Sequence, residues 1–572
     1  MTVAQFQVRR GAYYDSLVLM QLQHGLLELP GVLDAGVVMA TPANCSLLAA
    51  NDLLLDTVVA GADDMLIVVK AESDLAAEAA LARVDELLAR RRSAGQQDFR
   101  PRSLGSAVKL LPDAGWVLVS VPGRYAAGVA REALDLGRHV FLYSDNVPLD
   151  DEVALKHSAR AKGLLVMGPD CGTAIINGVG LGFANRVRRG PIGLVGASGT
   201  GLQAITSHIH AQGAGVSQAI GTGGRDLKAE VGAITAHQAL DLLARDPGTK
   251  VIVLVSKPPA PEVAARLLAA AQATGKPVVV DFIGYPPPAR QLGNLHFAAT
   301  LSEAAEIAVS QASVISGQSS VASRQLSAAG SRLPAAVAPA RGYLRGLFSG
   351  GTLAYETLLG LQATLSPLFS NAPITDTQLL TDPLHSRAHT IIDLGGDDFT
   401  VGRLHPMLDN DLRIRRLRQE AADPEVGLIL LDVVLGEGAH ADPAAELAPI
   451  IRAVRDQRSE LEVVTVVIGT DEDPQNLQSQ VDRFGEAGAT VYRDVAAAVA
   501  HVTQRLRDHA ADEHPPVMLD RFSQAPLAAI NVGLESFYDS LIAQEAQAVH
   551  VEWRPPAGGN EKLAALLARM KK

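Results

Sequence analysis

Short uninterrupted apolar runs alternate with longer Ala-rich segments through most of the chain. A strand that is buried on both faces has such a run, without the polar alternation of a half-exposed strand. The segments 261–274 and 442–455 have the length and composition of helices that connect parallel strands. The order strand, helix, strand therefore predicts an α/β protein with parallel sheets. The predicted strands are 117–121, 163–167, 192–195, 251–255, 278–280 and 428–431.

The first hundred residues have a different pattern. They predict a helix over about 16–29, strands at 36–40 and 65–69, and a charged helix over about 74–92. A sheet and helices in so short a segment predict a small α+β module over 1–100.

A glycine-rich motif occurs twice, and its surroundings repeat with it. The segment 223–226, Gly-Gly-Arg-Asp, returns as 395–398, Gly-Gly-Asp-Asp, an offset of 395 − 223 = 172 residues. Each copy is followed by a helix, an Asp-Pro turn, a buried strand and an Ala-rich helix, and a Gly-Thr pair precedes each copy. Two related α/β domains explain this pattern, and chance similarity between doubly wound folds is the alternative.

These patterns together predict the domain organisation. Ser, Ala, Gly and Gln dominate a linker between the two related domains. The tail follows a polar break and contains Arg-Pro-Pro-Ala-Gly-Gly, which favours a docking segment over a core element. The predicted parts are an α+β module over 1–100, a Rossmann-like domain over 101–190, a flavodoxin-like domain over 191–312, a linker over 313–340, a second flavodoxin-like domain over 341–512 and a tail over 513–572.

Composition limits the classes of function. The chain has 572 residues, 48% of them hydrophobic, and 62 acidic against 50 basic residues give a formal charge of −12. That balance leaves no positive field for nucleic acid or an anionic membrane, so neither is expected as a partner. Two cysteines, Cys45 and Cys171, are too few for a disulfide framework and fit a reducing cytoplasm. The first residues lack the apolar core of a signal peptide, and no apolar run is long enough to span a membrane.

Two glycine-rich loops, 196–201 and 346–352, open helices and are candidate anion sites. Glycines let backbone N–H groups approach a ligand, and the helix N-terminus adds partial positive charge, a combination that binds phosphate. A plain helix cap at Ser198 in a tight turn is the alternative. The candidate phosphate-binding residues are Ser198, Gly199, Thr200, Gly223, Gly224, Ser349, Gly350, Gly351, Thr352, Gly395 and Gly396.

Sharper nucleotide motifs do not fit the first loop. Residues 199–204 match G-x-G-x-x-A, but no acidic residue follows at the spacing of a dinucleotide site. A P-loop needs Lys followed by Ser or Thr, and a nucleophile elbow needs Gly where Thr200 stands. A simple cradle for a phosphate or an acyl phosphate remains, and two helix N-termini that meet at one anion would explain the repeat.

Three turns in order carry a resemblance to a known family. Residues 168–172, Gly-Pro-Asp-Cys-Gly, resemble the G-P-N-C-P-G turn of the succinyl-CoA synthetase α subunit. Residues 197–200 resemble its S-R-S-G-T phosphate loop, and 221–226 its G-I-G-G-D-P loop. The loop at Gly350 is similar to the phosphate-facing loop of the β subunit. The whole chain resembles the FdrA family, acyl-CoA synthetase homologues associated with oxamate carbamoyltransferase in allantoin degradation. This resemblance implies domains similar to the α subunit and to the C-terminal domain of the β subunit.

The departures from that family bear on the reaction. His296 is out of register with the family's phosphohistidine and is flanked by apolar residues, so we expect it to be structural. Lys257 stands where the family has a carboxylate that stabilises the phosphohistidine, which suits an anionic ligand instead. An exposed strand-end lysine is the alternative. No CoA-cradling glycine loop precedes Val117, and no segment is left for an ATP-grasp domain, so ATP-driven ligation by this chain alone is not expected.

A polar loop after the predicted strand 428–431 supplies further candidates. Glu437 and His440 would position an acid, a base or a carbamoyl-binding donor, and together with Lys257 they are the expected catalytic residues. Asp442 is expected to cap the next helix. The candidate substrate-binding residues are Asp170, Cys171, Asp398 and His405.

These features predict group transfer through an acyl phosphate. Following the resemblance, we expect a subunit of oxamate carbamoyltransferase, which converts carbamoyl phosphate and oxamate to oxalurate and phosphate. An acyl-CoA synthetase subunit, with CoA as a ligand, and a non-catalytic scaffold are the alternatives. We expect small anions and other protein subunits as partners, an oligomer, and no certain cofactor. No metal site is expected, since His208 and His210 face different sides of one helix.

Overall fold

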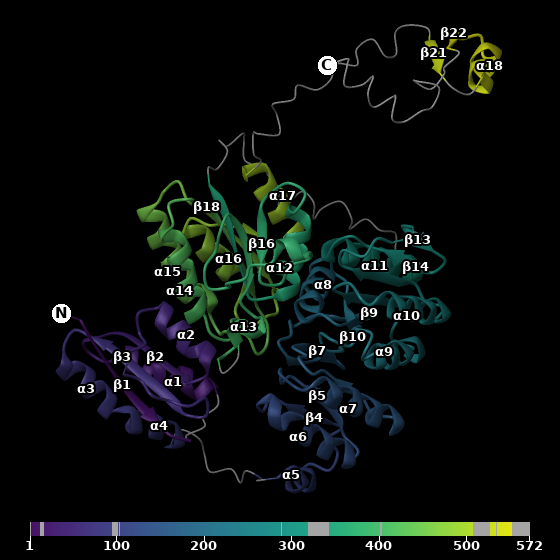
Figure 1. The fold of residues 1–572 in the computed structure, drawn as a ribbon. Helices are drawn as coiled ribbons and strands as arrows, with labels where there is room; N and C mark the ends of the chain where they lie inside the picture. The colour runs from purple at the N-terminus through teal and green to yellow at the C-terminus, as the bar shows by residue number, and fades with distance from the viewer. Residues whose placement is uncertain are drawn as a thin grey trace, which may run out of the picture. The chain divides into compact units, whose positions relative to one another are not determined.

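The computed structural model contains five sheets among the residues that it describes. These residues are 2–11, 16–55, 57–93, 101, 103–287, 289–317, 342–400, 403–506, 527–532 and 535–551. Contacts divide the chain into two units, Met1–Arg507 and Asp508–Lys572 (Figure 1). The predicted class, a small α+β module followed by parallel-sheet α/β domains, is confirmed. In the described part of the chain, no helix has the length and apolar character needed to cross a membrane.

The N-terminal module is an antiparallel sheet in the order β1-β3-β2 with helices on both faces. Along β3, Ile67 and Val69 pack towards α1 and α3, whereas Leu66 and Val68 pack towards α2. The predicted charged helix is interrupted near Arg83, and the edge strand β1 was not predicted. Its elements are β1 (Val3–Arg9), α1 (Ser16–Leu27), β2 (Val32–Met39), α2 (Pro42–Ala50), β3 (Met65–Ala71), α3 (Asp74–Ala82) and α4 (Val84–Ser93).

The next segment contributes to two sheets. A three-stranded parallel sheet in the order β4-β5-β6 forms the Rossmann-like part. The hairpin of β7 and β8 leaves that sheet and pairs with β10 of the following domain. The elements are α5 (Leu104–Leu110), β4 (Trp116–Val119), α6 (Gly123–Asp135), β5 (His139–Leu142), α7 (Leu149–Ala161), β6 (Val166–Met167), β7 (Thr173–Ile176) and β8 (Val179–Gly182).

The first flavodoxin-like domain has an eight-stranded sheet in the order β13-β14-β12-β11-β9-β10-β7-β8. Along β11, Val253 and Val255 pack towards α8 and α11, while Ile252 and Leu254 pack towards α9 and α10. Both faces are therefore buried, as uninterrupted apolar strands predict. Its elements are β9 (Arg189–Gly196), α8 (Gly199–Ala211), β10 (Val216–Gly221), α9 (Ile234–Arg245), β11 (Val251–Ser256), α10 (Pro261–Ala273), β12 (Val278–Phe282), β13 (Gln291–Leu292), β14 (Leu295–Phe297) and α11 (Leu301–Ser316).

The second flavodoxin-like domain has a parallel sheet in the order β16-β17-β15-β18-β19-β20. Its central order β17-β15-β18-β19 matches β10-β9-β11-β12 of the first domain, which supports the inference that the two are related. Its elements are β15 (Tyr343–Phe348), α12 (Gly351–Leu361), β16 (Leu368–Ser370), η2 (Asp376–Gln378), β17 (His389–Asp393), α13 (Asp397–Thr400), α14 (Asp411–Ala422), β18 (Val426–Val434), α15 (Pro443–Gln457), β19 (Glu462–Ile468), α16 (Leu477–Glu486), β20 (Thr490–Tyr492) and α17 (Val495–Leu506).

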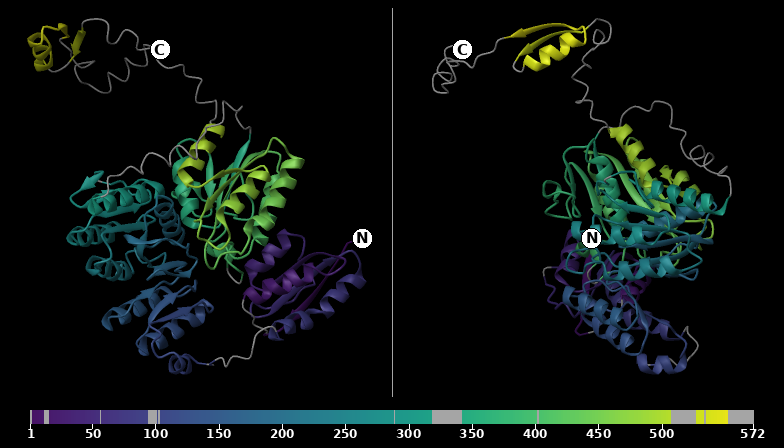
Figure 2. Two further views of the ribbon diagram at one scale, coloured as in Figure 1. Left: turned by 180° about the vertical axis from the view of Figure 1, so that it is seen from behind. Right: turned by 90° about the vertical axis from the view of Figure 1, so that its right-hand side faces the viewer.

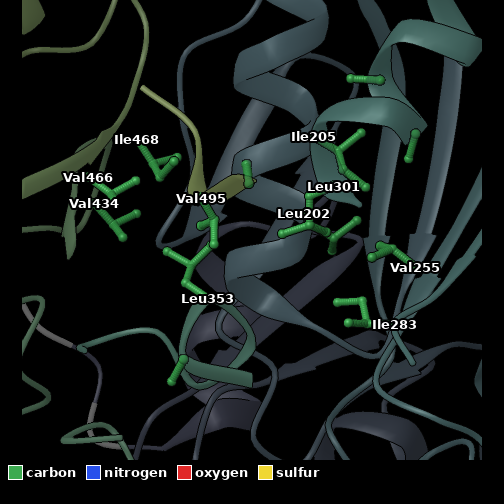
Figure 3. Packing of buried hydrophobic residues seen from close by; sticks show 14 of the residues in the cluster. Leu202, Ile205, Val255, Ile283, Leu301, Leu353, Val434, Val466, Ile468 and Val495 are labelled. Carbon is green, nitrogen blue, oxygen red and sulfur yellow. The ribbon is translucent and has the colours of Figure 1, made fainter. Parts of the chain in front are cut away.

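One hydrophobic core joins the two flavodoxin-like domains. Leu202 of α8 and Leu301 of α11 belong to the same buried cluster as Leu353 of α12 and Val495 of α17 (Figure 3). Each of these side chains is at most 4% exposed. Burial of this kind stabilises the pairing of the two domains and holds the start of α8 against the start of α12. Of the predicted linker, residues 318–340 lie outside the described part of the chain.

The second unit contains a small β-α-β element that was not predicted. Strands β21 (Ala528–Val532) and β22 (Gln547–Val551) are parallel, and α18 (Glu535–Ala543) lies along one face of the pair (Figure 2). Alternate residues on the other face, among them Ile530 and Val549, are exposed. The remainder of the predicted docking tail, 513–526, 533–534 and 552–572, lies outside the described residues.

Candidate anion-binding site

The loop before α8 leaves two backbone donors open. Ser198 caps the helix, and its Oγ accepts a hydrogen bond of 3.0 Å from the Gly201 N–H. The intrahelical bonds begin with the Leu202 N–H, which donates to the Ser198 carbonyl. No described residue accepts a hydrogen bond from the N–H of Gly199 or Thr200. A helix N-terminus with open donors is a favourable position for an anion.

A buried hydroxyl faces the same loop. Thr173 on β7 is 2% exposed, and its Oγ1 has no hydrogen-bond partner among the described residues. A Cβ built on Gly199 would lie 3.3 Å from this oxygen. An unsatisfied buried hydroxyl costs about 1–3 kcal/mol, so its position beside open backbone donors points to a missing ligand. Thr173 was not predicted from the sequence, because it reaches the loop through the β7–β8 hairpin, which pairs with β10 of the following domain.

The two glycine-rich loops are in direct contact, as the repeat predicted. The Ser198 and Thr352 hydroxyl oxygens are 2.7 Å apart. A Cβ built on Gly350 would lie 2.6 Å from Cγ2 of Thr200, so only glycine allows this approach. That the two loops share one bound anion stays a prediction.

The second loop already holds an internal carboxylate. Asp432, in the middle of β18, is fully buried. Its Oδ1 accepts hydrogen bonds from the Ser349 N–H at 2.7 Å and from the Ser349 Oγ at 2.9 Å. Its Oδ2 accepts a bond of 2.8 Å from the Gly350 N–H. Arg413 lies behind Asp432 and contacts Oδ1 at 3.4 Å. These two backbone donors are therefore unavailable to a ligand.

A second carboxylate, that of Asp393, lies beside Gly351, the first residue of α12. Asp393 ends β17, is 8% exposed, and accepts a 3.0 Å hydrogen bond from the Gly395 N–H on Oδ1. A Cβ built on Gly351 would lie 2.3 Å from its Oδ2. Burial raises the pKa of Asp393, and the positive charge of Lys257 opposes that rise. The start of α12 thus faces a carboxylate of its own chain.

Asp170 and Lys257 face this region from the first flavodoxin-like domain and the turn beside it. Asp170 has a φ of 55°, and its N–H donates to the Ser144 carbonyl at 3.0 Å. The residue reaches solvent, yet protein atoms exclude much of the surrounding water. This desolvation, reinforced by Asp145, raises the pKa of Asp170 to about 7, and Lys257 opposes the rise.

Lys257 follows β11 and is half-buried. Its Nζ lies 5.6 Å from the ring centre of Tyr355 on α12, a cation–π contact between the two domains. It forms no ion pair shorter than 4 Å with any described residue. The structure therefore places this ammonium beside Tyr355 and in electrostatic interaction with Asp170 and Asp393, without a close ion pair to a described residue.

The first Gly-Gly pair packs against the turn that holds Asp170. A Cβ on Gly223 would lie 2.3 Å from the Pro169 carbonyl oxygen, and one on Gly224 would lie 3.2 Å from the Asp170 Oδ2. Cys171 is 2% exposed, and burial raises its pKa to about 12, so it is a thiol. This placement does not support the expectation that Cys171 binds substrate.

A buried ion-pair network fixes the adjoining loop 221–226. Lys156 on α7 is fully buried and pairs with Glu152 at 2.8 Å and Asp226 at 2.7 Å. Its Nζ also donates to the Thr222 carbonyl at 3.0 Å. Asp226 in turn accepts bonds from the Thr235 and Ala236 N–H groups at the start of α9. Fully satisfied networks of this kind rigidify a loop.

The second Gly-Gly pair and His405 line the α12 side. A Cβ on Gly395 would lie 2.9 Å from the His405 Nε2 and 2.6 Å from the Ser349 carbonyl oxygen. The Met407 N–H donates to the His405 Nδ1 at 3.2 Å, so Nε2 carries the proton of the neutral ring. Burial lowers the pKa of His405 to about 4. Gly396 lies beside Asp393, and Asp398 is an exposed residue of α13.

Glu437 and His440 make contacts of their own, away from the two loops. The Glu437 Oε1 accepts a 2.5 Å hydrogen bond from the Arg186 Nε, and its backbone forms a β-bridge with Ala184. The His440 Nε2 lies 3.2 Å from the Glu446 Oε1, which raises the pKa of His440. No described contact joins either residue to the glycine loops. Their catalytic role stays a prediction that these contacts do not favour.

Asp442 caps α15, as predicted. Its Oδ1 accepts a hydrogen bond of 3.1 Å from the Ala445 N–H, and Pro443 is the first residue of the helix. The His440 Nδ1 accepts a 3.1 Å bond from the Asp442 N–H, so both nitrogens of that ring are engaged.

Three family models match successive parts of the chain. Residues 1–102 match a model described as AllF, heavy metal-associated domain. Residues 189–322 match the succinyl-CoA ligase like flavodoxin domain, and residues 347–505 match the CoA-ligase model. The chain is therefore a succinyl-CoA ligase-like protein with an AllF-type N-terminal domain.

Similar proteins place it more closely. YahF of Escherichia coli is 42% identical over 488 residues, which cover 84% of this chain and 94% of YahF. The chain belongs to the same family as YahF. The α subunit 1 of the ADP-forming succinate–CoA ligase of Archaeoglobus fulgidus is 30% identical over 184 residues, 31% of this chain and 61% of that subunit. The crystal structure of PH0766 from Pyrococcus horikoshii aligns with this chain with a TM-score of 0.30 at 14% identity. The alignment covers 70% of this chain and 86% of the PH0766 chain.

The donor set of the N-terminal module does not fit a heavy-metal ion. Soft metal sites use paired thiolates or imidazoles, whereas residues 1–102 contain one cysteine, Cys45, and one histidine, His24. Burial raises the pKa of Cys45, which disfavours the thiolate. Among the described residues, no group of three His, Cys, Asp or Glu side chains is placed to hold a metal ion.

Proposed function

We propose that the chain is the acyl-phosphate-binding subunit of an oxamate carbamoyltransferase. The reaction joins the carbamoyl group of carbamoyl phosphate to oxamate and gives oxalurate and phosphate. The AllF-type domain and the resemblance to the FdrA family support this assignment. The observation that carries it is the open start of α8, where two N–H groups without a described acceptor lie beside the unpaired Thr173 hydroxyl.

The open donors suit the charge that develops in this reaction. The oxamate amide nitrogen attacks the carbonyl carbon of carbamoyl phosphate, and a C–N bond forms. The C–O bond to phosphate breaks, its electron pair passes to the phosphate oxygen, and the amide proton leaves with the phosphate. The N–H groups of Gly199 and Thr200 would hold that oxygen charge from the start, without any side chain of the protein giving up a proton. Lys257 would neutralise a second oxygen.

The histidine chemistry of succinyl-CoA synthetases finds little support here. His296 lies on β14, where its backbone is paired between β12 and β13, and burial lowers its pKa. His405 faces the loops with a protonated Nε2, which lacks the free electron pair of a nucleophile. Direct transfer from a bound acyl phosphate needs no phosphohistidine.

The test is a carbamoyl-phosphate/oxamate exchange assay on the full chain, alone and together with the proteins that co-purify with it. We expect phosphate release that depends on oxamate and falls at least tenfold in Thr173→Val with Lys257→Met, because one donor and one charge are lost together. A CoA-dependent ATPase assay is run beside it. Absence of exchange in every mixture would contradict the proposal.

A CoA ligase subunit is the second candidate, favoured by the match to the CoA-ligase model over 347–505. In that case the same α8 loop would bind the phosphate of an acyl phosphate formed from ATP on another subunit. CoA-dependent ATP hydrolysis without carbamoyl transfer would select this candidate.

A further inference from the structure

The surroundings of Asp170, in the turn next to the start of α8, hold more negative than positive charge. Asp170 and Asp393 both interact electrostatically with Lys257, and Asp145 and Asp397 add negative charge around Asp170. Four carboxylates against one ammonium disfavour a ligand that is anionic at every end. A ligand that fits must present its anionic end to α8 and hydrogen-bond donors to the carboxylates.

Of these carboxylates, that of Asp170 is the open acceptor. Asp393 accepts the Gly395 N–H, and Asp145 is hydrogen-bonded by Asn146 and Thr400. No described residue donates a hydrogen bond to the Asp170 carboxylate. Its position is set by the backbone, because the Asp170 N–H donates to the Ser144 carbonyl. Gly224 leaves room for Oδ2, which would lie 3.2 Å from a Cβ built on that glycine.

The anionic end of the ligand is marked independently. The Thr173 hydroxyl is 2% exposed, unpaired, and directed towards Gly199, the first residue of the 13-residue helix α8. It lies three residues after Asp170, at the first residue of β7. The unpaired Thr173 hydroxyl and the open Asp170 carboxylate are therefore close together in sequence. The hydroxyl lies on the side of the expected phosphate, and the carboxylate lies on the side of the other acidic residues.

We propose that Asp170 is a specificity-determining residue, whose carboxylate accepts the N–H of an amino group attached to the acyl carbon. The site would thereby take carbamoyl phosphate in preference to acyl phosphates that carry a methyl group in that place. This inference rests on the proposed function. A carbamoyl NH₂ offers two donors and a methyl group offers none. A hydrogen bond to a charged acceptor corresponds to a preference of about ten- to a hundredfold.

The test is a set of binding isotherms on the full chain in metal-free buffer at about pH 8, where the Asp170 carboxyl, whose pKa is raised to about 7, is mostly ionised. Carbamoyl phosphate, acetyl phosphate and inorganic phosphate are titrated into the wild type, into Asp170→Asn and into Asp113→Asn. Asn tolerates the positive φ of residue 170 and removes its charge. Asp113 is an exposed residue before β4 and is the matched control.

We expect the wild type and Asp113→Asn to bind carbamoyl phosphate about ten- to a hundredfold more tightly than acetyl phosphate. In Asp170→Asn that preference should shrink below about threefold, while inorganic phosphate binds equally or more tightly, because a negative charge is gone. If Asp170 had only a structural role, Asp170→Asn would weaken the binding of all three ligands together.

Three results would overturn the proposal. Equal affinity of the wild type for carbamoyl and acetyl phosphate removes the amino-group subsite, and this comparison needs no variant to fold. If Asp170→Asn still prefers carbamoyl phosphate over acetyl phosphate, another residue selects the ligand. If the preference appears only with added Mg²⁺, the carboxylates bind a cation and not the amino group. If the wild type binds no phosphate compound at all, the proposed function itself fails.

Discussion

Two related helices, α8 and α12, begin in similar loops and meet there, but only the start of α12 has carboxylates of the second domain beside it. At α8 the N–H groups of Gly199 and Thr200 are open to a ligand. At α12 the carboxylate of Asp432 holds the loop before the helix, and Asp393 lies against Gly351. No described residue accepts a hydrogen bond from the Gly351 or Thr352 N–H either, so α12 is closed to an anion by the charge of these two carboxylates and not by occupied donors in its first turn.

The repeat itself shows where the difference arises. At the offset of 172 residues, Asp393 at the end of β17 corresponds to Gly221 at the end of β10, since 393 − 172 = 221. A Cβ on Gly221 would lie 2.5 Å from the Cys171 Sγ. The turn and hairpin that carry Cys171 and Thr173 thus occupy the space that an aspartate side chain fills in the second domain.

This comparison assigns different tasks to the two loops. A ligand that competed for the Ser349 and Gly350 N–H groups before α12 would have to displace a buried carboxylate that is paired with Arg413. The α12 loop is better suited to hold the α8 loop in place, through the contact of Thr352 with Ser198. Of the two related domains, the first then binds the anion at the start of α8, and the second holds the α8 loop in place with the start of α12.

The largest expected effect is on stability at the closed helix. In Asp432→Ala the buried Arg413 guanidinium, the Ser349 hydroxyl and two backbone N–H groups lose their acceptor. We expect the free energy of unfolding to fall by about 3–5 kcal/mol, measured by urea denaturation. Asp456→Ala, an exposed residue of α15, is the control and should change it by less than about 0.5 kcal/mol. A small loss in Asp432→Ala would show that the α12 loop does not depend on its internal anion.

The next effect is on the open helix. Lys257→Met keeps most of the apolar stem and removes the charge beside the site, so affinity for a phosphate compound or turnover should fall about ten- to a hundredfold. Thermal stability should hardly change, because the half-buried lysine forms no close ion pair with the described residues. Lys250→Met, at the exposed start of the same strand, is the control. Full activity in Lys257→Met would show that this lysine is a plain surface residue.

The class of fold was predictable because apolar periodicity is a local signal. Runs such as 251–255 and 428–431 have no polar interruption, and both became strands buried on two faces. The edge strand β1 was missed because its residues are all half-buried and alternate with glutamine and arginine. The β-α-β element of the tail was missed because its strands expose apolar residues on an uncovered face.

The site was predictable only in part. Glycine-rich loops can be recognised in the sequence, and Ser198 and Gly350 were found from them. Lys257 was found from its place at a strand end and from the resemblance to the succinyl-CoA synthetases. Thr173 and Asp393 act through neighbours far along the chain, so no local pattern marks them. A lone acidic residue within the apolar strand β18 was a usable signal for Asp432, since a buried carboxylate needs partners. Proximity in sequence was misleading for Glu437 and His440, whose side chains turn to Arg186 and Glu446.

A smaller effect on phosphate affinity is expected at Thr173, and it distinguishes a hydroxyl that faces the ligand from one that is only buried. Thr173 and Thr465 are both nearly inaccessible, and both hydroxyls are unpaired among the described residues. Valine at either position removes the unsatisfied group, so neither variant should lose much stability. Phosphate affinity should fall about three- to tenfold in Thr173→Val and stay unchanged in Thr465→Val, measured by calorimetric titration. Equal affinities in the two variants would contradict the placement of the anion at Gly199.

The smallest effect should come from opening the closed helix by one charge. Burial raises the pKa of Asp393, so its ionised form is disfavoured in the folded state. As pH rises from about 4, the unfolded chain ionises first, and the folded protein loses stability until the pH passes the raised value. Asp393→Asn keeps the acceptor for Gly395 and removes this loss, so its stability relative to the wild type should increase from pH 4 to pH 8.

Phosphate affinity should also rise in Asp393→Asn, about two- to fivefold, because a charge at the start of a helix is worth about 0.3–1 kcal/mol. Asp398→Asn, which removes one exposed charge of α13, controls for net charge. If Asp393→Asn and Asp398→Asn behave alike in both measurements, the Asp393 carboxylate does not close α12, and the contrast between the two helices is lost.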